Sequence, residues 1–261
     1  MDQRRAPRFS RRHRSGGAGR PAGGEAGAVR AGRISAGVAP RARHQNHNEG
    51  IALAYITPIL ATVLAYLIGS LSFAVLVSKV MGLNDPRTYG SKNPGATNVL
   101  RSGSKKAAIL TLLLDALKGW LPVVAVKWWG ESWGLGDGTV ALVGLAAFLG
   151  HLWPVFFRFQ GGKGVATAAG VIIGFEPWLG LAVLLTWVIV AYAFRYSSLA
   201  SIVTAVFAPV FYLFGNHVAW RAPGMLVLSL AVMGLLLVWR HAENINRLVA
   251  GKESKLGAKK S

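Results

Sequence analysis

Residues 178–214 read WLGLAVLLTWVIVAYAFRYSSLASIVTAVFAPVFYLF, and Arg195 is the only charged residue among them. The stretch consists of two apolar runs, 178–194 and 199–214, separated by a short polar turn. A transmembrane helix needs about 20 predominantly apolar residues. The two runs therefore predict a pair of membrane-spanning helices joined by that turn.

The same alternation of apolar runs and short polar breaks extends over the chain from about residue 51 onward. The other candidate spans are residues 52–80, 107–129, 139–157, 165–175 and 224–239. The run 165–175 contains glycines and has roughly half the usual length, so we expect it to be tilted, re-entrant or continuous with its neighbour. The prediction is an all-α membrane protein with about seven transmembrane helices, one of them short or broken.

The overall composition agrees with this class, because 52% of the residues are hydrophobic and the mean hydropathy is +0.41. The formal net charge of +19 would by itself suggest a nucleic-acid-binding protein. However, 11 of the 29 Lys and Arg residues lie within residues 1–50, and most of the others lie in short loops. This distribution argues against nucleic acid as a partner. The absence of cysteine excludes disulfides, thiolate catalysis and cysteine metal sites.

The charges of the loops predict an orientation. With seven spans, the loops 82–106 and 158–164, the turn at Arg195 and the segment after residue 239 lie on one side. That side holds Arg87, Lys92, Arg101, Lys105, Lys106, Arg158, Lys163, Arg195, Arg240, Arg247 and Lys252. The opposite loops hold Glu131, Asp137, Glu176 and the lone cation Arg221. By the positive-inside rule, the first side is cytoplasmic.

Residues 1–50 form an Arg-, Gly- and Ala-rich tail with hardly any large apolar residue, and we predict that the tail is disordered. It lacks the apolar core of a secretory signal peptide. Seven spans place this cationic tail outside the cytoplasm, which conflicts with the positive-inside rule. We therefore favour the hypothesis that the natural chain begins downstream and that the working membrane domain comprises residues 51–261.

The first polar motif is GSKNPGATNVLR at residues 90–101. Asn-Pro and Pro-Gly mark turns, so the loop draws hydroxyls, amides, backbone N–H groups and Arg101 together at the membrane edge. Such a loop suits an anion. The alternative is an ordinary polar loop.

The second motif is HLWPVFFRFQGGKGVAT at residues 151–167. Its glycines allow backbone N–H groups to converge, Lys163 adds a positive charge, and the predicted helix that follows directs its positive dipole end to the same place. The spacing is not that of a Walker motif, so no nucleotide is inferred. Glycines that only permit close helix packing are the alternative.

The third motif is HAENINRLVAGKE at residues 241–253. His241, Asn244 and Arg247 are spaced so that they fall on one stripe of a helix and can face one ligand. A basic helix that binds anionic lipid headgroups is the alternative.

Asp115 and Lys118 lie within a predicted span, three residues apart, and can pair on one helix face. We favour a structural role for this pair, in support of the loops. The H-x-x-x-x-D motif of the soluble His-dependent acyltransferases is absent from the sequence. The positions of His151 and His241 give no argument for a metal site, so we expect no metal.

Together these motifs closely resemble those of the bacterial acyl-phosphate-dependent glycerol-3-phosphate acyltransferase family, integral inner-membrane enzymes of phospholipid synthesis. The resemblance runs from about residue 59 to residue 253. It rests on G-S-x-N-P-G-A-T-N-V-x-R at 90–101, G-H-x-x-P-x-x-x-x-F-x-G-G-K-G-V-A-T at 150–167, H-x-x-N-I-x-R-L-x-x-G-x-E at 241–253, and Asp115 with Lys118 and Gly119. The departures are the tail before residue 51 and Lys92, where a small residue is more usual.

The resemblance implies transfer of an acyl group from acyl phosphate to the 1-hydroxyl of glycerol 3-phosphate. The products would be 1-acylglycerol 3-phosphate (lysophosphatidic acid) and inorganic phosphate. The implied setting is the bacterial inner membrane, with the active site on the cytoplasmic side. We expect no cofactor and no obligate protein partner beyond the two substrates and the bilayer.

The resemblance also assigns site residues. Those expected to bind glycerol 3-phosphate and orient its hydroxyl are Ser91, Arg101, Lys163, His241 and Asn244. Further residues expected at the substrates are Asn93, Gly95, Thr97, Asn98, His151, Gly161, Gly162, Gly164, Thr167, Arg247 and Glu253, with the backbone of Gly161 to Gly164 at the phosphate of the acyl phosphate. The departing phosphate is expected to accept the proton.

Two other classes of membrane protein remain as alternatives. A transporter would also combine several spans, intramembrane charges and broken helices. A scaffold that binds anionic lipids would need a basic face, but not the Asn-Pro-Gly turn or the glycine loop.

Overall fold

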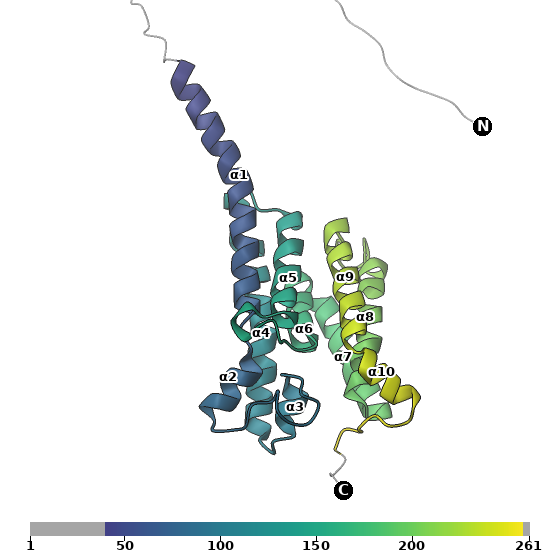
Figure 1. Ribbon diagram of the computed structural model, residues 1–261. Coiled ribbons are helices and arrows are strands. Elements are labelled where there is room, and N and C mark those ends of the chain that lie inside the picture. The colour runs from purple at the N-terminus through teal and green to yellow at the C-terminus, as the bar shows by residue number, and fades with distance from the viewer. Residues whose placement is uncertain (1–39, 258–261) are drawn as a thin grey trace, which may run out of the picture.

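The computed structural model describes the backbone of residues 40–257. Within this range the protein is all-helical, as predicted, and contains no β-strand (Figure 1). The helices are α1 (Pro40–Gly69), α2 (Phe73–Val80), α3 (Ala96–Leu100), α4 (Lys105–Trp129), α5 (Asp137–Leu152), α6 (Val165–Phe175), α7 (Pro177–Phe194), α8 (Ser197–Phe214), α9 (Gly224–Arg240) and α10 (Ala242–Val249). Two 3-10 turns, η1 (Glu131–Trp133) and η2 (Val155–Phe157), lie in the connections.

Four segments are long and apolar enough to cross a membrane: Lys105–Trp129, Asp137–Phe157, Pro177–Phe194 and Ser197–Phe214. Two bent helix pairs raise the number to six. These are Tyr55–Gly69 with Phe73–Val80, bent by 43°, and Gly224–Arg240 with Ala242–Val249, bent by 56°. The short α6 would be the seventh crossing, so the count of seven stays a prediction.

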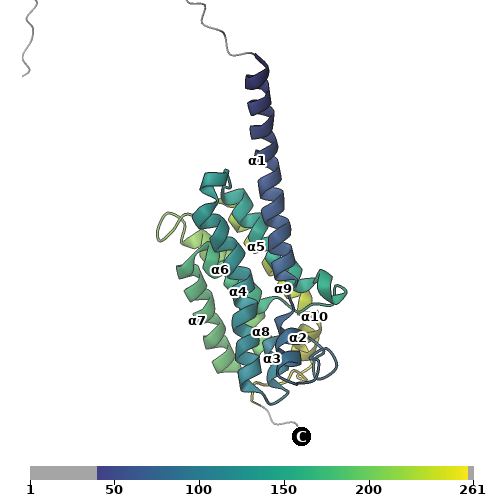
Figure 2. The same ribbon diagram turned by 90° about the vertical axis from the view of Figure 1, so that its left-hand side faces the viewer.

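Helix α6 is short because the glycine loop before it is recessed into the bundle. α6 packs along α4, and a Cβ atom added at Gly119 of α4 would lie 2.3 Å from the carbonyl oxygen of Thr167. α4 begins at Lys105, so it extends about 20 Å beyond the level of Gly119. Both views show the loop between α5 and α6 at mid-height, above α2 and α3 (Figures 1 and 2). The motif therefore lies inside the bundle rather than at its edge.

The four segments predicted to share one side of the membrane do come together. The backbone N–H of Leu256 donates to the carbonyl oxygen of Arg195 at 2.6 Å, and the guanidinium group of Arg240 donates to the glycine loop. The first polar loop reaches the second through Arg87, whose guanidinium carbon lies 5.8 Å from the ring centre of Phe157. α2, α3 and α10 accordingly lie at one end of the bundle (Figure 1).

The outer surface of the bundle is apolar, as a lipid-facing surface must be. Leu113, Leu184, Ile189 and Leu235 are each more than half exposed. At the end opposite the motif loops, α4, η1 and α7 expose Trp128, Trp129, Trp133 and Trp178. Exposed tryptophans at a helix end are typical of a membrane–water interface.

Helix α1 corrects one boundary of the sequence prediction. It begins at Pro40, so residues 40–50 are helical although they were assigned to the disordered tail. Extending an existing helix is easier than starting a new one, which explains how the first span continues into polar sequence. The remainder of the predicted tail, residues 1–39, lies outside the described residues.

Candidate active site

The glycine loop at residues 161–164 has a conformation that larger residues cannot adopt. Gly164 precedes α6 with a left-handed φ of 84°, and a Cβ atom there would lie 2.3 Å from the ring of Phe148. A Cβ atom on Gly161 would lie 2.1 Å from the carbonyl oxygen of His151. The loop thus packs backbone to backbone on the end of α5, with the start of α6 beside it.

Arg240 holds this loop in place from the end of α9. Its Nη2 atom donates to the carbonyl oxygens of Gly161 and Gly162, each at 3.0 Å, and its Nε atom donates to Gly162 at 3.2 Å. These bonds engage the carbonyl oxygens of Gly161 and Gly162, whereas no hydrogen bond among the described residues engages the backbone N–H groups of Gly161, Lys163 and Gly164. The N–H of Gly162 is an exception, since it donates to the carbonyl oxygen of His151 at 3.1 Å. Gly162 therefore supports the loop and does not offer its N–H to an anion.

Lys163 is the point where the second and third motifs meet. Its ammonium group donates to the side-chain oxygen of Asn244 on α10. The Asn244 amide donates in turn to Glu253 at 2.5 Å, and Glu253 also accepts from Arg247 at 2.7 Å and from Ser198 at 2.7 Å. The network joins the glycine loop, α8, α10 and the C-terminal segment.

The charges in this network perturb one another. Burial, together with the nearby positive charge of Arg247, lowers the pKa of Lys163 to about 8. Burial tends to raise the pKa of Glu253, but the hydrogen bonds from Arg247, Asn244 and Ser198 outweigh it and hold this pKa below its usual range. The site therefore contains a lysine that titrates just above neutral pH, beside a carboxylate that stays ionised.

His241 lies at the junction of α9 and α10, and its side chain is buried. Its Nδ1 atom lies 2.8 Å from the carbonyl oxygen of Leu237. A carbonyl oxygen can only accept, so Nδ1 carries the proton and Nε2 of the neutral ring is an acceptor. His241 can therefore accept a hydrogen bond from a hydroxyl group.

The first polar loop is closed by Asn98. The Asn98 amide donates to the carbonyl oxygens of Pro86 at 2.6 Å and Tyr89 at 3.1 Å, and its oxygen accepts from the backbone N–H of Ser91 at 3.1 Å. With its polar atoms engaged and its side chain buried, Asn98 braces the loop. These contacts favour a bracing role for Asn98, and its expected contact with a substrate stays a prediction.

The other residues of this loop are more open. Ser91, Thr97 and Arg101 are exposed, and Asn93 and Gly95 are partly buried. A Cβ atom on Gly162 would lie 3.0 Å from the carbonyl oxygen of Pro94, so this loop abuts the glycine loop. Among the described residues, however, no hydrogen bond or ion pair joins Ser91 or Arg101 to Lys163, His241 or Asn244.

A second, fully buried cluster lies beneath the glycine loop. Lys118 Nζ is 2.8 Å from Asp115 Oδ1, which is the pairing expected from their spacing, and it donates to the carbonyl oxygen of Leu71 at 2.6 Å. His151 Nδ1 lies 3.6 Å from Asp115 and 3.2 Å from the hydroxyl of Thr167. Both contacts fall on Nδ1, whereas a nucleophile–His–Asp triad needs one partner on each ring nitrogen. The cluster therefore favours support of the loop over nucleophilic catalysis.

Comparisons with known proteins agree with the motifs. Residues 59–251 match the family model described as glycerol-3-phosphate acyltransferase. A protein of that name from Albidiferax ferrireducens is 66% identical over 202 residues, which cover 77% of this chain and 90% of the relative. A protein of the same name from Burkholderia pseudomallei is 63% identical over 207 residues, covering 77% and 97% of the two chains.

The chain belongs to the glycerol-3-phosphate acyltransferase family. The fold agrees, because this family member matches the crystal structure of PlsY (YgiH), an integral membrane glycerol 3-phosphate acyltransferase, in its glycerol 3-phosphate form. The TM-score is 0.71, with 39% sequence identity over 77% of this chain and 96% of that chain. The lysophosphatidic acid form matches with a TM-score of 0.69. The resemblance seen in the motifs and the multi-pass membrane class are thus confirmed.

Two residues of this family member's site were missed by the sequence reasoning. The sequence indicates only that Arg240 is a loop cation, whereas in the structure it donates to two glycine carbonyl oxygens. Ser198 lies outside the three motifs, although it donates to Glu253. Only the chain's tertiary contacts reveal either role.

Proposed function

We propose that this protein transfers an acyl group from an acyl phosphate to the 1-hydroxyl of glycerol 3-phosphate. The products are 1-acylglycerol 3-phosphate and inorganic phosphate, and the reaction begins membrane phospholipid synthesis. The observation that carries the proposal is the meeting of the glycine loop and α10 at Lys163 and Asn244, beside the acceptor nitrogen of His241. Family membership favours this enzyme over the transporter and the lipid-binding scaffold.

The reaction needs two anion-binding places, because both substrates carry a phosphate group. Lys163 and Arg101 supply positive charge for glycerol 3-phosphate, and Ser91 supplies a hydroxyl. Asn244 supplies the amide hydrogen that does not donate to Glu253. For the acyl phosphate, the free backbone N–H groups of the glycine loop and of the first turn of α6 supply donors, with the positive end of the helix dipole. Thr97, Asn93 and Gly95 line the approach from the first loop.

The chemistry requires little beyond positioning and charge stabilisation, because an acyl phosphate is a mixed anhydride and carries its own leaving group. The hydroxyl oxygen attacks the acyl carbonyl carbon, the bond from that carbon to the phosphate oxygen breaks, and phosphate departs. His241 Nε2 accepts the hydrogen bond from the attacking hydroxyl and orients it, and the departing phosphate takes the proton. Glu253 and Arg247 hold Asn244 and α10 in position.

We place the enzyme in the bacterial inner membrane with this site facing the cytoplasm. The loops that converge on the site carry most of the cations outside the tail, as the positive-inside rule requires of cytoplasmic loops. The recessed glycine loop brings a water-soluble acceptor to the depth at which a lipid-soluble donor can meet it. No cofactor or protein partner enters this scheme.

The donor is tested with purified protein, glycerol 3-phosphate and either an acyl phosphate or an acyl thioester of the same chain. Formation of 1-acylglycerol 3-phosphate from the acyl phosphate only is the expected result. Product from the thioester at an equal rate would contradict the proposed donor.

The proton acceptor is tested with His241→Ala. If His241 only orients the hydroxyl, the variant loses both affinity for glycerol 3-phosphate and part of its kcat. Complete loss of turnover with unchanged affinity would instead identify His241 as the base.

A further inference from the structure

Residues 251–257 form neither helix nor strand, and we call this segment the C-terminal strap. Gly251 ends α10 with a left-handed φ of 66°, and its N–H donates to the carbonyl oxygen of Leu248 at 3.1 Å. The chain then turns back from α10 toward the end of α7 and α8 (Figure 1). Because no regular secondary structure holds the strap, its position depends on a few contacts of individual residues.

Arg195, in the turn between α7 and α8, is joined to the strap by a reciprocal pair of hydrogen bonds. The backbone N–H of Leu256 donates to the Arg195 carbonyl oxygen at 2.6 Å, and Nη2 of Arg195 donates to the Leu256 carbonyl oxygen at 3.0 Å. The ammonium group of Lys255 lies 5.9 Å from the ring centre of Tyr196. Arg195 thus binds both polar backbone groups of one strap residue, and we call this pair of bonds the clasp.

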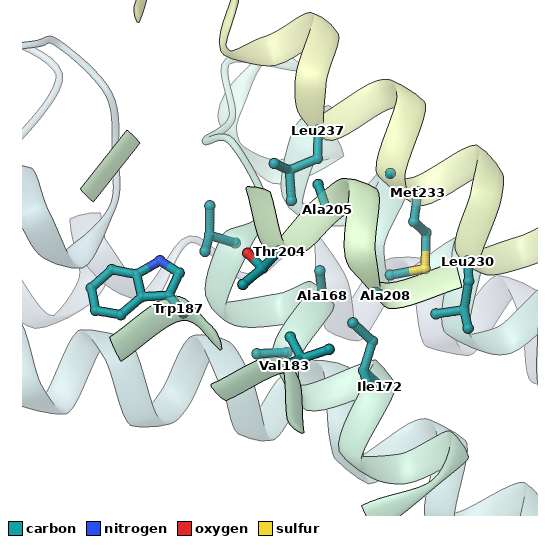
Figure 3. Close-up of a pocket in the computed structure, with 13 residues that line it drawn as sticks. Ala168, Ile172, Val183, Trp187, Thr204, Ala205, Ala208, Leu230, Met233 and Leu237 are labelled. Atoms are coloured by element: carbon teal, nitrogen blue, oxygen red, sulfur yellow. The ribbon is translucent and has the colours of Figure 1, made fainter. Parts of the chain in front are cut away.

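The clasp is attached to two helices that are themselves joined. The Trp187 indole of α7 donates to the Ser201 hydroxyl of α8 at 3.1 Å. Farther from the turn, Val183 of α7 and Ala205 of α8 line the same apolar cavity (Figure 3). α8 also carries Ser198, which donates to Glu253 at 2.7 Å. The clasp therefore holds the strap close to the residue of α8 that binds Glu253.

The strap carries Glu253 between α10 and the clasp. The side chain of Glu253 is only 10% exposed, and its carboxylate accepts from Ser198, Asn244 and Arg247. Leu256 follows three residues later, so at most about 10 Å of extended chain separates the two Cα atoms. While the clasp is closed, Glu253 cannot move far from α8 and α10.

We propose that Arg195 is a positioning residue for the reaction, because its clasp keeps Glu253 in contact with α8 and α10. Glu253 then holds Asn244, and Asn244 holds the ammonium group of Lys163. The inference rests on the proposed function, since its consequence is a change in the binding of glycerol 3-phosphate. A clasp that only adds stability to the fold is the alternative, and the test separates the two.

The clasp also affects the charge of Lys163. The charged and titratable groups that face this lysine are Glu243 and Arg247 from α10, Arg240 from α9, His241 from the junction of these helices, and Glu253 from the strap. Burial is the largest cause of the lowered pKa of Lys163, about 8, Arg247 lowers this pKa further, and Glu253 raises it. Release of Glu253 therefore lowers the pKa of Lys163, so the lysine loses its proton at a lower pH.

Two substitutions open the clasp from opposite sides. Arg195→Gly removes the guanidinium donor and suits the left-handed φ of 62° at this position, and Leu256→Pro removes the backbone N–H donor. Arg195→Lys restores a cationic donor. The matched controls are Arg158→Gly, at another exposed arginine with a left-handed φ of 54°, and Leu256→Ala, which keeps the backbone N–H. The readouts are KM for glycerol 3-phosphate, kcat, and the pH at which kcat/KM falls.

Each clasp variant is expected to raise KM about threefold with kcat nearly unchanged, because the loss of one hydrogen bond changes an equilibrium by about this factor. The fall of kcat/KM should move to lower pH. Arg195→Lys should recover part of the lost affinity, and both controls should keep the wild-type values. A wild-type KM and pH profile in both clasp variants would overturn the proposal.

The double variant Arg195→Gly/Glu253→Gln separates positioning from general stability. If the clasp acts through Glu253, Arg195→Gly raises KM by a smaller factor in the Glu253→Gln protein than in the wild type. Equal factors in the two backgrounds overturn the proposal. A fall in kcat and melting temperature without a change in KM does so as well.

A measurement on the wild-type protein needs neither turnover nor a variant that folds. Hydrogen exchange, followed by mass spectrometry in nanodiscs, should be slower at the Leu256 amide than in an unstructured peptide of the same sequence. Equal exchange rates would show that the clasp is open and overturn the inference. Failure of every acyl phosphate to react would contradict the proposed function instead and leave the protection of Leu256 unchanged, so the two failures are distinguishable.

Discussion

Lys163 is the residue on which the account of phosphate binding depends most. Three glycines surround it in sequence, so its neighbours contribute backbone groups and leave its ammonium group as the loop's cation. Asn244 fixes that group from α10. Many proteins bind phosphate with backbone N–H groups and one lysine together, and the loop around Lys163 has the same groups.

The pKa of Lys163 predicts how activity depends on pH. Because burial lowers this pKa to about 8, the lysine is a cation below that pH and becomes neutral as the pH rises through it. We therefore expect kcat/KM for glycerol 3-phosphate to fall as the pH rises above about 8. Lys163→Arg, whose side chain remains charged, should move this fall to higher pH. A wild-type profile that stays flat through pH 8 would contradict the role of the lysine.

We propose that Glu253 acts by positioning Asn244, Arg247 and Ser198, which all donate to its carboxylate. Glu253→Gln removes the charge that holds these donors, and hydrogen bonds to charged groups are worth about 1.5–3 kcal/mol. We expect kcat/KM for glycerol 3-phosphate to fall about tenfold or more, mostly through KM, and Glu253→Asp to recover part of the loss. Glu243→Gln is the control, because the exposed carboxylate of Glu243 also faces Arg247, with a longer distance of 3.7 Å to its guanidinium group. Equal effects of Glu253→Gln and Glu243→Gln would contradict the positioning role.

At the level of helices, the contact between α4 and α6 determines the depth of the glycine loop. Gly119, Gly170 and Gly174 let the two helices approach so closely that added side chains would meet backbone or valine atoms. Small residues at helix interfaces are common in membranes, where close packing replaces the hydrophobic effect as the driving force. The glycines thus keep the start of α6 beside Asp115 and Lys118.

Gly170→Ala tests this contact. The new Cβ atom would lie 1.9 Å from the carbonyl oxygen of Ala116, so α4 and α6 must separate. Overpacking of this kind costs about 1–3 kcal/mol, and we expect a lower melting temperature and reduced activity. Gly138→Ala on α5 is the matched control, since nothing lies within 4 Å of its added atom. Equal melting temperatures for the two variants would contradict the account of the contact.

For the whole molecule, the topology predicts that the motif loops face the cytoplasm. The natural absence of cysteine allows a direct test with single cysteines at exposed positions. We expect Lys92→Cys and Ser254→Cys to react with a membrane-impermeant maleimide only from the cytoplasmic side, and Ser132→Cys only from outside. Labelling of Lys92→Cys and Ser132→Cys from the same side would exclude an odd number of crossings between them and contradict the orientation.

Much of the molecule follows from its sequence, because apolar runs and glycine–lysine patterns depend on local physical rules. The helical class, the membrane setting and the family resemblance were all correctly predicted. The depth of the glycine loop was not, since it depends on Gly119 meeting Thr167 across helices. The bracing contacts of Asn98 could not be predicted either, because a polar side chain in a motif does not show which backbone atoms it binds. The sequence does not distinguish Arg240 from other cations at a membrane edge, because its contacts with the glycine loop depend on the tertiary structure.

The most direct test of the account is the release of inorganic phosphate by the purified protein. We expect release from acyl phosphate only when glycerol 3-phosphate is present, with one phosphate for each 1-acylglycerol 3-phosphate formed, and a large loss of both in Lys163→Ala. Equal release without glycerol 3-phosphate, or an undiminished rate in Lys163→Ala, would contradict the central claim that this loop brings the two substrates together.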